Sequence, residues 1–189
     1  MTCIVGLVEN GTVYLGGDSA GVNGSLHLTV RADPKVFRNG PCLIGYTSSF
    51  RMGQLLRYKL EPPLCAPATD PLEYLATSFV DAVRGTLKAG GMASKENDVE
   101  QGGAFLVGYR GRLFTIHEDY QVGESTVPYA AVGCGAPYAL GALFAAPPTV
   151  TPDVRLRVAL EAAEQFSAGV RRPFVFEALP ALAVPSEES

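Results

Sequence analysis

The sequence predicts an α+β fold in one domain. Three pairs of short apolar segments are each joined by a tight turn, which indicates hairpins and therefore mostly antiparallel sheet. Segments with helical periodicity lie between these pairs. At 189 residues, 47% of them hydrophobic, the chain is long enough to bury a sizeable core. We expect the domain to span residues 1–180 and to be followed by a loosely ordered tail over residues 181–189.

The first strand pair carries the strongest turn signal. Residues 3–8 and 13–17 flank Asn10-Gly11, and Asn-Gly favours a type I′ turn because both central residues need positive φ. The other predicted strands are residues 35–38 and 42–46 around Asn39-Gly40-Pro41, residues 104–109 and 113–116 around Arg110-Gly111-Arg112, residues 127–132 and residues 174–179.

The predicted helices are marked by capping residues and prolines. Asp70-Pro71 starts a helix that runs to about Lys88, with an N-cap aspartate followed by proline at the first helical position. The other predicted helices are residues 48–60, a short one from Pro137 to Pro147, and one that starts at Thr151 and carries an apolar face to Ser167. Residues 89–103 are expected to form a polar loop.

Composition excludes several classes of function. The net charge of −4 argues against nucleic acid as the main partner. No apolar run is long enough to span a bilayer, and no basic residue precedes Arg31, so we expect no membrane partner and a cytoplasmic protein. The four cysteines are widely spaced, which predicts buried thiols and neither a disulfide framework nor a zinc site. We expect no cofactor and no metal.

Few of the usual catalytic motifs are present. The chain has two histidines and no G-x-S-x-G elbow, which argues against a Ser-His-Asp triad. His117-Glu118-Asp119 is interpreted as a solvated strand end, since three adjacent strand residues cannot all face one ion. Neither a Walker A loop nor a complete Rossmann fingerprint occurs.

Thr2 offers a different chemistry. Removal of an initiator methionine is efficient before a small residue, so we expect a mature chain that begins with Thr2. A hydroxyl nucleophile needs a base, and an α-amine, with a reference pKa of about 7.7–8.0, is partly neutral near pH 7. A lysine, at about 10.4, is almost wholly charged and would supply positive charge instead.

Asp18 and Lys35 are candidates to complete this site. Counting back from the Asn-Gly turn sets Cys3 opposite Asp18 and Thr2 opposite Ser19, so the hairpin returns a carboxylate to the N-terminus. In that ideal register the side chains of Asp18 and Thr2 point to opposite faces of the sheet.

Five short motifs occur in order along the chain. They are Thr2-Cys3-Ile4-Val5-Gly6, Gly16-Gly17-Asp18-Ser19, Lys35-Val36-Phe37, Ile44-Gly45 and Gly133-Cys134-Gly135-Ala136-Pro137-Tyr138-Ala139. In their order and spacing, over roughly residues 2–176, these motifs resemble the β-subunit of the proteasome and its HslV-type relative, within the N-terminal nucleophile hydrolases.

The resemblance implies a four-layer αββα sandwich and a threonine protease in stacked rings that acts on peptides or unfolded proteins, with a possible ATP-dependent unfoldase or cap. It makes Thr2 the nucleophile and Asp18 with Lys35 its supporting pair. The backbone N–H of Gly45 would donate to the oxyanion. Leu43 and Thr47 would line the pocket for the residue that precedes the scissile bond.

Two positions depart from the family pattern. Cys134 stands where the family has a serine, and a thiol is the weaker hydrogen-bonding group; taken alone, it is a buried small hydrophobe. The family's late Asp-x-x-Ser element corresponds to Glu164 and Ser167. Helical geometry favours Ser167 over Glu164, since it places Ser167 in the middle of the apolar face.

Three alternatives remain open at this point. In the first, Thr2 is an ordinary residue at the start of a strand. In the second, the same chemistry acts on a small amide, as in the acylases of the superfamily. In the third, the chain is a non-catalytic ring subunit. The intact Thr2, Asp18 and Lys35 set argues against the last of these.

Overall fold

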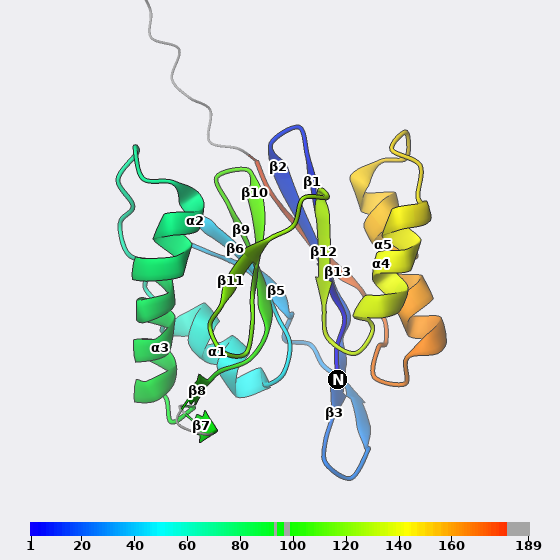
Figure 1. Cartoon of the computed structure of the whole chain (residues 1–189). Coiled ribbons are helices and arrows are strands. Elements are labelled where there is room, and N and C mark those ends of the chain that lie inside the picture. Colours follow the sequence, from blue (N-terminus) through cyan, green and yellow to red (C-terminus); the bar gives the residue numbers. More distant parts are fainter. Residues whose placement is uncertain (93, 97–98, 181–189) are drawn as a thin grey trace, which may run out of the picture.

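The computed structural model describes residues 1–92, 94–96 and 99–180, and most of their strands lie in two antiparallel sheets (Figure 1). One sheet has the order β12-β1-β2-β13 and the other the order β11-β10-β9-β6-β5. The strands of the first sheet are β1 (Ile4–Glu9), β2 (Thr12–Gly17), β12 (Tyr129–Val132) and β13 (Val175–Leu179). Those of the second are β5 (Val36–Asn39), β6 (Cys42–Tyr46), β9 (Phe105–Tyr109), β10 (Arg112–Ile116) and β11 (Val122–Glu124).

The β1–β2 hairpin has the predicted turn and register. Asn10 and Gly11 have φ of 49° and 72°, as a type I′ turn requires. Glu9 pairs with Thr12, and the ladder continues to Ile4 opposite Gly17. Asp18 therefore follows directly after β2 and arrives beside the start of the chain.

The helices begin at the predicted caps or close to them. Ser49 caps α1 (Phe50–Tyr58) through its hydroxyl, and Asp70 caps α2 (Pro71–Tyr74) through its carboxylate. From α2 the chain continues through the π-helical η1 (Leu75–Phe79) into α3 (Val80–Ala89). The remaining helices of the described chain are α4 (Ala136–Ala145) and α5 (Pro152–Phe166).

Three apolar clusters show how the elements pack. One joins the second sheet to α1, η1 and α3, for example through Phe79 and Phe105. A second joins β1 to α4 and α5, and a third, with Ile4 and Leu43, lies between the sheets. Figure 1 shows the same order, with helices on the outer side of each sheet.

Some predicted boundaries were wrong. The loop expected over residues 89–103 includes the short hairpin of β7 (Ser94–Glu96) and β8 (Val99–Gln101). The sequence reading also missed β11 and the hairpin of β3 (Ala20–Val22) and β4 (Leu28–Val30), which are only three residues each. Such short strands carry too little alternation to be recognised.

The tail expected over residues 181–189 lies outside the described residues. Among the helices of the described chain, none combines the length and the apolarity that crossing a membrane requires.

Candidate active site

Thr2, Lys35 and Asp18 meet at the end of the β1–β2 hairpin. The Lys35 Nζ donates to Thr2 Oγ1 at 2.9 Å and to Asp18 Oδ1 at 2.8 Å. Asp18 and Lys35 are each only 1% exposed. Lys35 precedes β5, which belongs to the second sheet, so the site forms where the two sheets meet.

The Asp18 carboxylate is fixed by further donors. Its oxygens accept backbone N–H groups of Cys3 at 3.0 Å, Ala20 at 2.8 Å and Arg171 at 3.2 Å. The predicted register put the Asp18 and Thr2 side chains on opposite faces, and the structure connects them through the Lys35 ammonium. A buried carboxylate with this many donors is satisfied without solvent.

Burial lowers the pKa of the Lys35 ammonium below its usual value, and the Asp18 carboxylate opposes that shift. A charged lysine at this place raises the local positive potential beside the Thr2 hydroxyl. Such a charge stabilises the alkoxide that a nucleophilic threonine must become.

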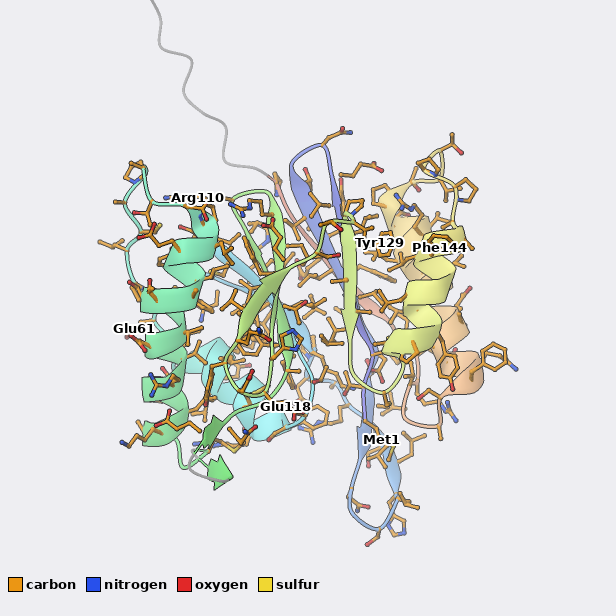
Figure 2. The ribbon with its side chains drawn as sticks, in the orientation of Figure 1. Met1, Glu61, Arg110, Glu118, Tyr129 and Phe144 are labelled. Carbon is orange, nitrogen blue, oxygen red and sulfur yellow. The ribbon has the colours of Figure 1, made fainter. Side chains whose placement is uncertain are left out.

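Met1 covers Thr2 in the full-length chain. The Thr2 hydroxyl donates to the Met1 carbonyl oxygen, and Met1 itself is 47% exposed beside β3 (Figure 2). While Met1 is attached, the Thr2 nitrogen is an amide and has no basic lone pair. The residues that surround the hydroxyl are nevertheless in place.

Cys134 lies against the backbone of Thr2. Its Sγ is 3.3 Å from the Thr2 nitrogen and 3.4 Å from the Thr2 carbonyl oxygen. The expectation that Cys134 is a buried small hydrophobe is wrong, because this thiol is exposed. Gly133, at φ +98°, allows this turn to approach so closely, since a Cβ there would lie 2.2 Å from the Thr2 carbonyl oxygen.

Ser167 joins this group and Glu164 does not. The Ser167 Oγ is 3.3 Å from Cys134 Sγ. The Glu164 carboxylate pairs with Arg172 at 2.7 Å and accepts the Arg172 backbone N–H, which also holds the pKa of Glu164 below its usual value. Ser167 is the C-cap of α5 and not the middle of its apolar face, because the helix ends at Phe166.

The structure contradicts the role expected for Gly45. Gly45 lies within β6 and pairs with Val36 on one side and Leu106 on the other. The Thr47 N–H donates to the carbonyl oxygen of Ala104, directly before β9, so the N–H of Gly45, two residues earlier, points into the ladder between β6 and β9. Gly45 instead allows close sheet packing, since a Cβ there would lie 2.5 Å from Ile4 Cγ2.

Of the two residues expected to line the substrate pocket, Leu43 lies in the core and Thr47 lines a cavity. Leu43 is fully buried between the two sheets with Ile4 and Val13, so the prediction that it lines a substrate pocket is wrong. Thr47 directly follows β6 and lines a cavity together with Thr2 and Lys35.

Ser48 is a residue that the sequence analysis missed. It lines the same cavity as Thr2 and has φ +64°, which is rare for a residue with a side chain. Its N–H makes no hydrogen bond to another described residue. A signal existed in the run Thr47-Ser48-Ser49 after β6, because small polar residues at a strand end favour turns.

No group of three or more metal-ligating side chains occurs among residues 1–92, 94–96 and 99–180.

Comparison with solved structures identifies the fold. No family model matches the sequence, and no curated protein matches it. BPH from Thiobacillus denitrificans is similar at a TM-score of 0.81 and 21% identity over 97% of this chain and 100% of that one. HslV from Trypanosoma brucei is similar at 0.69 and 18% over 95% and 99%. Anbu from Yersinia bercovieri is similar at 0.65 and 17% over 95% and 82%.

These similarities define the class of fold, which is that of the proteasome-like subunits. The resemblance that the sequence motifs predicted is thus confirmed at the level of the fold.

Proposed function

We propose that this protein is a threonine-type endopeptidase that hydrolyses peptide bonds with Thr2 as its nucleophile, once Met1 has been removed. The observation that supports it most directly is the position of the Lys35 ammonium, within hydrogen-bond reach of both Thr2 Oγ1 and Asp18 Oδ1. This contact places a positive charge beside the hydroxyl that must lose its proton to act as a nucleophile.

The proposed reaction uses groups of the first residue of the mature chain. The free α-amine of Thr2 takes the hydroxyl proton, and Oγ1 attacks the carbonyl carbon of the peptide. We assign the oxyanion to the backbone N–H of Ser48 in place of Gly45. Collapse breaks the C–N bond, the α-ammonium returns the proton to the leaving amine, and water hydrolyses the Thr2 ester.

Cys134 and Ser167 are proposed to position the α-amine. The Cys134 thiol touches the Thr2 nitrogen and the Ser167 hydroxyl. The pair would orient the amine toward Oγ1, so that the proton it takes from the hydroxyl remains available for the leaving amine.

We further propose the architecture and assembly of the related fold. Residues 1–180 would form one four-layer αββα domain, as the helices outside each sheet favour, and copies would stack in rings in the cytoplasm with an unfoldase or cap as a possible partner. One BPH structure holds epoxomicin, which makes this inhibitor a suitable probe of Thr2.

The test compares the wild type with Thr2→Ala on fluorogenic peptides. We expect cleavage to fall at least 100-fold in Thr2→Ala, while the control Thr126→Ala, on an exposed loop, keeps the wild-type rate. Equal activity in Thr2→Ala would contradict the mechanism. Negative-stain images distinguish the alternatives, since rings favour a peptidase and a compact monomer or dimer favours a small-amide acylase.

A further inference from the structure

The cavity beside Thr2 is small. Its volume is about 40 Å³, and Met1 forms part of its wall. The other residues that matter for its shape are Thr2, Lys35, Tyr46, Thr47, Ser48 and Phe50. Met1 closes one side of the cavity, whereas Tyr46 and Phe50, which form other walls, belong to β6 and α1.

Phe50 closes this cavity with an aromatic ring. It is the first residue of α1, and the Ser49 cap fixes its backbone. The Arg31 guanidinium lies over the ring, 3.9 Å from its centre, and the Tyr46 ring meets it edge-on at 6.0 Å. Phe50 is therefore held from two sides.

Arg31 is itself anchored. Its guanidinium makes two hydrogen bonds of 2.8 Å to the Asp33 carboxylate, a planar pairing that fixes its orientation. Its aliphatic stem packs on Gly21, where a Cβ would lie 2.7 Å from Arg31 Cδ. The stack of Arg31 on Phe50 thus resists displacement of the ring.

The neighbouring wall, made by Tyr46, is also fixed by its packing. Tyr46 is buried in the core of the second sheet, and its ring occupies the space left by Gly53 in α1, where a Cβ would lie 2.1 Å from Tyr46 Cζ. The cavity cannot deepen in this direction unless α1 moves.

We propose that Phe50 limits the residue before the scissile bond to a small side chain, glycine or alanine. This inference rests on the proposed function and adds the substrate class to it. With Met1 in place the cavity of 40 Å³ holds a methyl group or a water molecule, whereas a benzene-sized group needs roughly 150 Å³. We expect the loss of Met1 to extend the cavity on the Met1 side and not past Phe50 and Tyr46. Large side chains at that position meet the ring of Phe50.

The test measures kcat/KM for two fluorogenic peptides that differ only in Ala or Leu before the cleaved bond. We expect the wild type to prefer the Ala peptide at least tenfold, and Phe50→Ala to raise the Leu-to-Ala ratio at least tenfold. Phe50→Leu should fall between them. The control is Tyr58→Ala, at the other end of α1 and largely exposed, which should leave both values unchanged.

The outcomes separate the two proposals. Cleavage of neither peptide by the Met1-free protein overturns the peptidase itself. Cleavage with a preference for Leu in the wild type, or an unchanged ratio in a Phe50→Ala protein whose melting temperature shows that it is folded, overturns the role of Phe50 alone.

Discussion

Lys35 and Asp18 form a buried ion pair in which Nζ lies 2.8 Å from Oδ1 and neither side chain has appreciable contact with solvent. The pair belongs to both sheets, because Asp18 follows β2 and Lys35 precedes β5. Its position connects the stability of the fold with the chemistry proposed for Thr2.

Removing one partner of this pair should destabilise the protein strongly. Asp18→Asn keeps the shape and leaves the Lys35 charge without its counter-ion, which for a buried pair costs about 3–5 kcal/mol in the free energy of unfolding. Urea unfolding measures this. The matched control is Asp81→Ala, which breaks the exposed pair with Arg84 and should change little. Similar effects of the two variants would argue against the buried pair.

The pH profile of kcat/KM should be bell-shaped. Activity rises with pH as the α-amine, with a reference pKa of about 7.7–8.0, loses its proton and becomes a base. Because burial lowers the pKa of Lys35, its ammonium loses its proton below the usual value of about 10.4, and activity declines before that pH is reached. A rate that stays constant up to pH 10.5 would contradict a charged Lys35 in the mechanism.

Cys134 should make the proposed peptidase activity sensitive to thiol reagents. Alkylation of this exposed thiol would push a bulky group against Thr2 and abolish activity. The buried thiols should not react, since burial raises the pKa of Cys42 to about 12 and is also the main cause of the raised pKa of Cys3. Peptide mass mapping locates the label. Cys134→Ser should keep peptidase activity and resist the reagent; loss of activity in a Cys134→Ser protein that is still labelled elsewhere would contradict this.

The new assignment of Gly45 has its own test. Gly45→Ala places a methyl group against Ile4 between the sheets, and overpacking of this kind costs about 1–3 kcal/mol. Gly85→Ala is the control, because nothing lies within 4 Å of its Cβ position in α3 and alanine favours a helix by roughly 0.5–1 kcal/mol. The melting temperature should therefore fall in Gly45→Ala and rise in Gly85→Ala. An unchanged melting temperature in Gly45→Ala would contradict the assignment of Gly45 to the packed space between the sheets and would favour a place at the edge of the pocket.

The sequence was most informative where local rules decide the structure. Asn10-Gly11 fixes the turn of the first hairpin, and the register that follows from it brings Asp18 to the N-terminus. The cap at Asp70 likewise follows from side-chain chemistry that acts over three residues.

Contacts between the two sheets could not be predicted in this way. Whether Gly45 and Leu43 face the cavity or the core depends on how two separate sheets pack, and no local pattern encodes that packing. The Arg31–Phe50 stack was missed for the same reason, since it joins a loop after β4 to the first turn of α1.

The most direct test of the account is the intact mass of the peptidase-active particle before and after reaction with epoxomicin. We predict a chain that has lost Met1 and gains one inhibitor, which peptide mapping places on Thr2. An active particle in which every chain retains Met1, or in which the inhibitor is found on another residue, would contradict the central claim.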